Sequence, residues 1–310
     1  MSDVKIGLIG GSGLGELLAS EQTATRHEVD TPFGRPSDAI FETDWHGLPV
    51  FFLSRHGPGH LLRPSAVPYR ANIFALKKLG VTHILASGAV GSLRQELKPR
   101  DLVIADQVID KTNGRGSTFF EKAAVHVEFA EPFCPVLRQL LTEAGQQMPK
   151  SAETPFDVHG NGCYVAMEGP AFSTRAESLM HRLWGGDLIG MTAMPEAKLA
   201  KEAEISYALV ALVTDYDSWK KPAAPKDGEP AAADPFALLN EIIGNLTVAS
   251  ANAASLMKTT IELIAAHRDR LQACPAQHAL RLAIWSDKAK IDPDEVQRLG
   301  PLWLKYFVGS

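Results

Sequence analysis

Short, nearly uninterrupted apolar runs alternate along this chain with longer amphipathic stretches. The apolar runs end in glycine, serine or charged residues and cover residues 5–9, 48–53, 83–86, 102–104, 187–189 and 207–213. Continuous Val, Ile, Leu and Ala are typical of strands that are buried on both faces. Helical spacing covers 70–79 and 174–184, the latter with Ser173 or Thr174 as N-cap. This alternation predicts an α/β fold.

The C-terminal third has a different pattern. Residues 220–235 are rich in proline and alanine, which predicts a mobile surface loop. Residues 236–270 have the spacing of one or two helices, and two short amphipathic stretches follow Cys274. No internal repeat is evident. We therefore expect one domain over 1–310, with the loop 220–235 and a helical C-terminal segment 236–310.

Composition narrows the class of protein. The chain has 310 residues, of which 45% are hydrophobic and 22% charged, and this is ordinary for a globular protein. Its net charge of -5, without a basic cluster, argues against a nucleic-acid partner. The start MSDVKIGLIGG is unlike a secretory signal, and no apolar run approaches the ~20 residues of a membrane span. The widely spaced Cys134, Cys163 and Cys274 suit reduced thiols. We expect a cytoplasmic protein without a membrane partner.

Polar residues gather where the predicted strands end. In an open α/β sheet, ligands bind at the carboxyl ends of the strands, so these residues are candidates for one site. They are Gly10-Gly11-Ser12-Gly13, Ser54-Arg55-His56-Gly57, Ser87-Gly88-Ala89, Gly190-Met191-Thr192 and Thr214-Asp215-Tyr216-Asp217.

The glycine turn after the first strand resembles a dinucleotide-binding loop only loosely. Glu16 stands where that fingerprint requires its third glycine. A tight turn with backbone N–H groups suits phosphate better. Arg55 and His56 add a guanidinium fork and a second donor, which also suit a tetrahedral anion. The alternative is an exposed arginine beside a histidine that caps a helix.

Asp215 and Asp217 form the most informative pair. Residues i and i+2 of an extended segment face the same side, so the two carboxylates should share one pocket. Their repulsion should raise one pKa and leave a neutral acid that can donate a proton. A surface pair and a metal pair are the alternatives. The segment Thr-Asp-Tyr-Asp-Ser-Trp supplies no His or Glu at a ligand spacing, so we expect no metal.

Seven ordered motifs follow one another along the chain. They are Ser54-Arg55-His56-Gly57, Tyr69-Arg70-Ala71-Asn72, Ala89-Val90-Gly91-Ser92-Leu93, Ala130-Glu131-Pro132-Phe133-Cys134-Pro135, Glu168-Gly169-Pro170 with Phe172-Ser173, Gly190-Met191-Thr192 with Pro195-Glu196, and Thr214-Asp215-Tyr216-Asp217-Ser218-Trp219. Together they resemble the 5'-methylthioadenosine phosphorylase branch of the trimeric purine nucleoside phosphorylases. The resemblance runs in register from about Ile6 to Trp219 and more loosely beyond.

The resemblance implies a mixed sheet core flanked by helices and an enzyme that uses inorganic phosphate as co-substrate, with no cofactor. The expected reaction splits 5'-methylthioadenosine into adenine and 5-methylthioribose 1-phosphate. Phosphate would be held by the residues at Ser12, Arg55, His56, Gly88, Ala89 and Thr192. The nucleoside would be lined by Phe172, Ser173 and Met191, and its purine read by Asp215 and Asp217. His126 matches a histidine that family members lend to a neighbouring subunit, so a homotrimer is expected.

Two positions depart from that family pattern. Gly88 follows Ser87 where relatives often carry a second hydroxyl residue, which leaves only backbone contact with phosphate there. The loop 220–235 is also long, and it precedes the helix that usually covers the 5' substituent. Three alternative functions stay open. They are phosphorolysis of 6-oxopurine or a broader range of purine nucleosides, hydrolysis with water, and a catalytically silent binding protein on the same fold.

Overall fold

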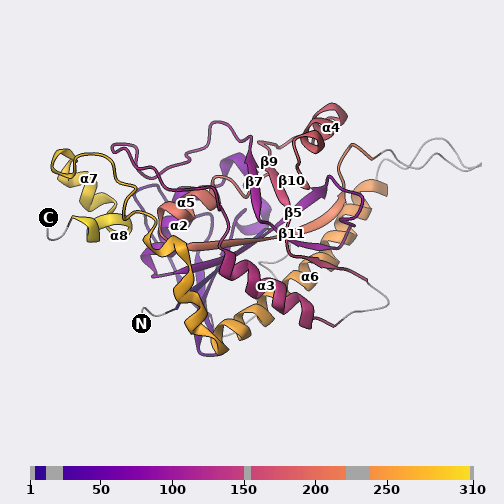
Figure 1. Cartoon of the computed structure of the whole chain (residues 1–310), viewed down its shortest axis with the longest axis horizontal. Helices are drawn as coiled ribbons and strands as arrows, with labels where there is room; N and C mark the ends of the chain where they lie inside the picture. The colour runs from indigo at the N-terminus through magenta and orange to yellow at the C-terminus, as the bar shows by residue number, and fades with distance from the viewer. Residues whose placement is uncertain (1–3, 12–23, 150–154, 221–236, 308–310) are drawn as a thin grey trace, which may run out of the picture.

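The computed structural model describes residues 4–11, 24–149, 155–220 and 237–307 (Figure 1). The predicted loop 220–235 lies outside this description, apart from Lys220. The described strands are β1 Ile6–Gly10, β2 Thr25–His27, β3 Ile40–Trp45, β4 Leu48–Ser54, β5 His83–Ser92, β6 Leu102–Ile104, β7 Gln107–Asp110, β8 Val158–His159, β9 Cys163–Ala166, β10 Leu188–Gly190 and β11 Ser206–Tyr216. The described α-helices are α2 Tyr69–Lys78, α3 Pro135–Gln147, α4 Arg175–Leu183, α5 Glu196–Glu202, α6 Ala237–Ala266, α7 Pro293–Arg298 and α8 Gly300–Trp303.

The described strands form one mixed sheet that branches at β5. Its main path runs β2-β3-β4-β1-β5-β10-β9-β7, while β11 pairs with β5 and β6. β5 is parallel to β1 and to β11, and its last residues are antiparallel to β10. The prediction of an α/β fold with a mixed sheet and flanking helices is therefore confirmed.

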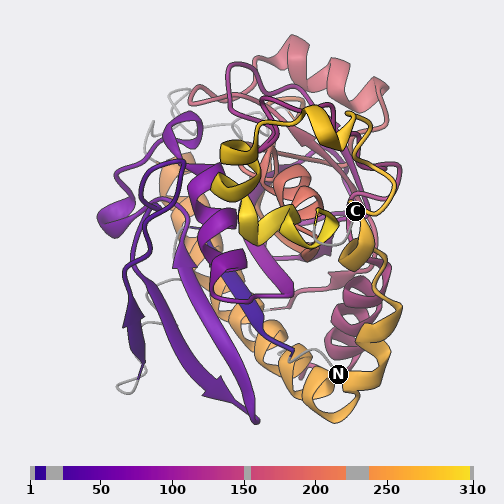
Figure 2. The ribbon, with the colours of Figure 1, turned by 90° about the vertical axis from the view of Figure 1, so that its left-hand side faces the viewer.

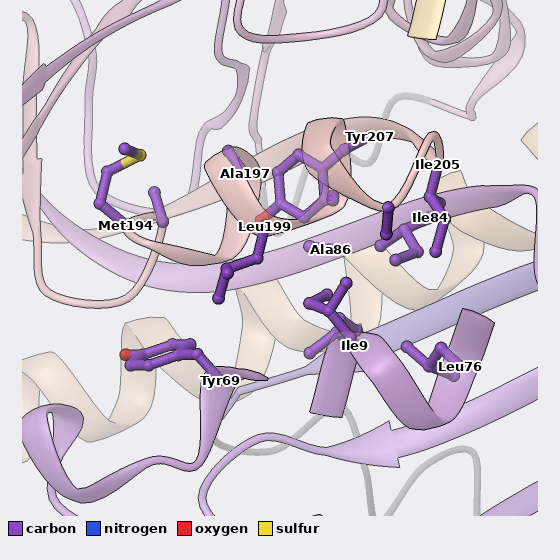
Figure 3. Close-up of a cluster of buried hydrophobic side chains, with 14 of the residues drawn as sticks. Ile9, Tyr69, Leu76, Ile84, Ala86, Met194, Ala197, Leu199, Ile205 and Tyr207 are labelled. Atoms are coloured by element: carbon purple, nitrogen blue, oxygen red, sulfur yellow. The ribbon is translucent and has the colours of Figure 1, made fainter. Parts of the chain in front are cut away.

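Helices cover both faces of this sheet, which explains why the strands are continuously apolar. Successive residues of a strand point to opposite faces. In β5, Ile84 packs into one buried cluster and Leu85 into the other. Figure 3 shows the first cluster, where Ile9 and Ile84 lie near Leu76 of α2. The second cluster is closed by α3 and α6, which lie below β5 and β11 in Figure 1.

The C-terminal residues are part of these cores. Trp303 of α8 is fully buried in the first cluster, and Figure 2 shows a yellow helix beside the purple helix α2, in agreement with the packing of α8 on α2. Buried Glu204 fastens this segment, because its Oε1 accepts hydrogen bonds from the Leu280 N–H at 3.1 Å and from the Tyr306 hydroxyl at 2.5 Å. None of the helices in the described ranges combines the length and apolar character of a membrane span.

The predicted elements hold closely, with two corrections that affect the site. Each predicted apolar run becomes a strand, and Thr174 is the N-cap of α4 through a capping box with Glu177. The third strand does not end at Ala86. Pairing with β11 carries β5 on to Ser92, so Ser87, Gly88 and Ala89 lie within the strand and not after it. β11 runs on to Tyr216, so Thr214, Asp215 and Tyr216 lie within it and not after it. The pattern missed β2, β3, β7, β8, β9, α3 and α5.

Candidate active site

The predicted anion-binding residues meet where β1, β4, β5 and β10 come together. The Arg55 N–H donates to Gly10 O at 3.0 Å, which joins the ends of β1 and β4. A methyl group on Gly11 would lie 3.4 Å from Arg55 Nη1 and 3.7 Å from Gly88 Cα. A methyl group on Gly88 would lie 3.3 Å from Thr192 Oγ1. The fold thus brings Gly11, Arg55, Gly88 and Thr192 together. Ser12 follows Gly11 but lies outside the described residues.

Arg55 is completely buried, so the alternative of an exposed arginine is wrong. Its Nε and Nη2 donate to the two carboxylate oxygens of Glu196, both at 2.7 Å, and Nη1 donates to Ser87 O. Burial opposes the charge on the guanidinium, but the ion pair with Glu196 outweighs it and raises the Arg55 pKa. The two-pronged contact predicted for an anion is therefore made to Glu196. Arg55 can offer an anion only its remaining Nη hydrogens.

His56 lies next to Arg55 as a neutral imidazole. Its Nδ1 lies 2.7 Å from Leu62 O, and because a carbonyl only accepts, Nδ1 carries the hydrogen and Nε2 is an acceptor. Burial lowers the His56 pKa to about 4; the hydrogen bond to Leu62 opposes this shift, and the nearby Arg55 and His60 add to it. At neutral pH, His56 Nε2 can thus accept a hydrogen bond from a protonated phosphate oxygen but cannot add a positive charge.

Gly88 and Ala89 face opposite sides of β5. Gly88 is buried beside Thr192, whereas Ala89 is exposed and pairs with Leu212 of β11. Ala89 could therefore reach a phosphate beside Thr192 only with its backbone.

Asp215 and Asp217 lie over the same point of β5, as predicted. An irregularity between Val213 and Asp215 shifts the register of β11, so that Asp215 pairs with Gly91. A methyl group on Gly91 would lie 3.3 Å from Asp217 Cβ and 3.6 Å from Asp215 Oδ2. The missing side chain at Gly91 thus leaves room for both carboxylates.

The two carboxyl groups have different surroundings. Burial raises the Asp215 pKa, the hydrogen bond from the Thr214 hydroxyl at 2.7 Å opposes that rise, and Asp217 and Glu241 add to it. The predicted repulsion from Asp217 therefore acts in the expected direction, but burial is the larger cause. Asp217 is 7% exposed, and its Oδ2 has no hydrogen-bond partner among the described residues. Such an atom needs a donor, and the amino group of a bound purine could supply one.

The segment that carries these carboxylates is fixed to the end of β5, to Ser173 and to α4. The Trp219 indole N–H donates to Ser92 O at 2.8 Å, and the Ser218 hydroxyl donates to Ser173 O at 3.0 Å. The guanidinium of Arg182 stacks 3.8 Å from the Trp219 ring centroid. Ser173 is thereby brought to the aspartates. Phe172 precedes it with a side chain that is 79% exposed.

Met191 and Thr192 follow β10 and are held by different groups. The Thr192 N–H donates to the Tyr164 hydroxyl at 3.3 Å, and Gly190 leaves space for the Tyr164 ring. The Met191 side chain packs against the backbone of Gly169. Its carbonyl accepts a hydrogen bond from Arg115 at 2.7 Å.

His126 stands apart from these residues. Its backbone N–H donates to Ala283 O, and its exposed ring packs at 4.7 Å against Trp285, which is itself 72% exposed. Across the described residues, none of these contacts reaches another predicted site residue. Within one subunit, the contacts described for His126 are with Ala283 and Trp285.

Sequence reasoning missed three residues that organise the site. Glu196 lay within a quoted motif, but nothing local indicated that it pairs with Arg55, which is 141 positions away. Tyr164 and Arg115 gave no signal. A glycine inside an apolar strand, such as Gly91, was the one local hint that something packs closely there.

Comparison with known proteins identifies the family. The sequence profile described as the phosphorylase superfamily matches residues 5–262. The chain belongs to this superfamily. Together with the relatives and solved structures described next, this match confirms the resemblance predicted from the motifs.

Two curated relatives are named S-methyl-5'-thioadenosine phosphorylase. The protein of Synechocystis sp. is 43% identical over 308 residues, covering 99% of this chain and 89% of the relative. That of Geobacter sulfurreducens is 45% identical over 296 residues, covering 95% and 96%.

Solved structures agree with these relatives. A methylthioadenosine phosphorylase from an Antarctic soil metagenomic library has a TM-score of 0.83 and 42% identity, covering 97% of this chain and 99% of that one. A methylthioadenosine phosphorylase from Schistosoma mansoni, solved with adenine, has a TM-score of 0.78 and 36% identity, covering 91% and 99%.

Proposed function

We propose that the chain splits 5'-methylthioadenosine with inorganic phosphate into adenine and 5-methylthioribose 1-phosphate. One observation carries this beyond family membership. The anion cluster and the two aspartates adjoin the same neighbouring segment: a methyl group on Gly88 would meet Thr192, just after β10, and one on Gly91 would meet Ile189 of β10 as well as the aspartates. Gly88 and Gly91 are three residues or about 10 Å apart along β5. That separation suits a nucleoside whose ribose meets phosphate at one end and whose purine meets carboxyl groups at the other.

The proposed chemistry follows from these two clusters. Cleavage of a glycosidic bond passes through a cationic sugar, which phosphate bound beneath the ribose stabilises and then attacks. Asp215, whose pKa is raised, is the proton donor to the five-membered ring of the departing purine. Asp217 Oδ2 accepts a hydrogen bond from the purine amino group. These are the catalytic and base-reading roles that we assign.

The nearest alternative substrate is a 6-oxopurine nucleoside. Its oxo group would place an acceptor against the acceptor of Asp217, a mismatch that costs about 1–3 kcal/mol. The aspartate pair therefore favours an aminopurine. Ser12, Arg55, His56, Gly88, Ala89 and Thr192 serve phosphate in this proposal, and Phe172, Ser173 and Met191 line the nucleoside.

The test is the dependence of adenine release on phosphate. Purified protein with methylthioadenosine should release adenine and a sugar phosphate only when phosphate is present, and it should turn over inosine far more slowly. Equal adenine release in phosphate-free buffer would establish hydrolysis. Absence of turnover in both buffers would favour a binding protein.

We further propose that the working unit is a cytoplasmic homotrimer in which His126 completes the site of a neighbouring subunit. Its exposed position beside Trp285, away from the other site residues, supports this role. Ring-like assemblies close through such heterologous contacts. The products, a purine base and a sulfur-containing sugar phosphate, suit purine and methionine salvage.

Subunit mixing tests the shared site. Asp215→Ala and His126→Ala proteins, each of low activity, are mixed under conditions that exchange subunits. Some mixed interfaces then combine both wild-type residues, so activity should return. A lack of recovery despite exchange proved by mass spectrometry, or an active species with the mass of one chain, contradicts the proposal.

A further inference from the structure

Arg115 is a buried arginine with no role in the chemistry described above. It lies in the loop after β7, and its side chain is only 3% exposed. Its Nε lies 3.0 Å from Glu168 Oε2, and the same carboxylate oxygen accepts the Asn113 N–H at 2.9 Å. Because a buried guanidinium cannot hydrogen-bond to water, protein groups must accept hydrogen bonds from its N–H donors.

Most of those groups are backbone carbonyls of two loops at the proposed nucleoside site. Nη1 donates to Met191 O at 2.7 Å and to Met194 O at 2.8 Å. Nη2 donates to Glu168 O at 2.8 Å. Because the donors of a guanidinium are fixed in one plane, these bonds set the loop at 191–194 and the loop at 168–169 relative to one another.

The junction of these two loops is where Met191 sits. Its sulfur packs so closely against Gly169 that a methyl group there would clash with it. Arg115 holds both partners of this contact, since it binds the carbonyl of Met191 and the residue next to Gly169. The position of the Met191 side chain thus depends on Arg115.

The anion cluster has additional supports of its own, although the Thr192 N–H belongs to the same peptide group as the Met191 carbonyl that Arg115 binds. The N–H of Thr192 is bound by Tyr164, and Arg55 is fixed by Glu196. Arg115 makes no hydrogen bond to Arg55, His56, Gly88 or Thr192 within the described residues. Loss of Arg115 should therefore loosen one half of the site more than the other.

We propose that Arg115 is a positioning residue for the nucleoside half of the site, acting through Met191 and Gly169. This rests on the proposed function, which assigns Met191 to the nucleoside. A purely structural role would weaken nucleoside and phosphate binding together. A positioning role predicts that nucleoside binding weakens much more than phosphate binding.

Calorimetry on the full-length protein tests this separation with Arg115→Lys, which keeps the charge but loses the fork. Methylthioadenosine is titrated without phosphate, where a phosphorylase leaves it intact, and phosphate is titrated without nucleoside. We expect the nucleoside Kd to rise about tenfold or more, which corresponds to the loss of one or two hydrogen bonds, and the phosphate Kd to change less than about threefold.

Two further variants serve as controls, one in the phosphate half of the site and one outside the site. Tyr164→Phe removes the partner of the Thr192 N–H, so its phosphate Kd should rise more than its nucleoside Kd. Arg270→Lys alters a two-pronged pair with Glu143 that lies outside the site and should change neither. If Arg115→Lys does not fold, Glu168→Gln weakens the same junction more gently and should shift the nucleoside Kd in the same direction.

The positioning role is overturned if Arg115→Lys raises the nucleoside Kd and the phosphate Kd by the same factor, or if it leaves the nucleoside Kd unchanged. Cleavage of methylthioadenosine by wild-type protein during the phosphate-free titration would instead overturn the proposed phosphorolysis. Failure of the positioning role is therefore seen in the Kd values of Arg115→Lys, whereas failure of the proposed phosphorolysis is seen as cleavage by the wild-type protein.

Discussion

Replacing Glu196 by alanine should be among the most damaging single changes to this fold. The Arg55 and Glu196 side chains are both fully buried and share two hydrogen bonds of 2.7 Å, and the Tyr207 hydroxyl donates to the same carboxylate at 2.8 Å. Removing one partner of a buried ion pair costs about 3–5 kcal/mol, because the other charge is left uncompensated. An unfolding entropy of about 2.1 cal/mol/K per residue over 310 residues converts this to a fall in Tm of roughly 5–8 °C.

Scanning calorimetry at a fixed protein concentration measures this fall. Glu196→Gln should lower Tm less than Glu196→Ala does, since the amide oxygen still accepts a hydrogen bond from the Tyr207 hydroxyl. Glu143→Ala is the matched control, because it breaks a similar two-pronged pair with Arg270 whose side chains are 34% and 28% exposed. Water screens that pair, so its loss should shift Tm much less. A fall below about 2 °C in Glu196→Ala, or one no larger than in the control, would refute the reasoning.

Two further changes test the base site and the acid limit of stability. Asp217→Asn should lower kcat/KM for methylthioadenosine and shift the ratio of kcat/KM values toward inosine by roughly 10- to 100-fold, because an amide at the position that faces the amino group can donate to an oxo group; an unchanged ratio would place Asp217 outside the base site. Burial lowers the pKa of His83 to about 4, so the unfolded chain binds more protons than the folded one between about pH 6.5 and 4, and stability falls as pH decreases through that window. Urea unfolding at pH 7 and pH 4.5 measures this loss of unfolding free energy, and His83→Gln should make the difference between the two pH values smaller by up to about 3 kcal/mol. The same difference in the wild type and in His83→Gln would contradict the prediction.

Local sequence determined the most apolar strands, several helices and the chemical character of the site. The apolar runs became strands because both faces of the sheet are covered, so alternate residues of a run enter different cores. Thr174 and Glu177 specify the start of α4 through bonds within one turn. Asp215 and Asp217 share a face because an extended chain has a period of two.

Only the tertiary structure decided which groups meet. β5 continues to Ser92 because β11, more than a hundred residues later, pairs along its whole length. The Arg55 fork faces Glu196 for the same reason, since strand order selects a partner 141 positions away. Arg115 became a support of the nucleoside site because β9 and β10 place the residues that follow them beside the loop after β7. Local propensity depends on neighbours in sequence, whereas these contacts depend on strand pairing between distant segments. Hydrophobic periodicity alone therefore does not predict these contacts.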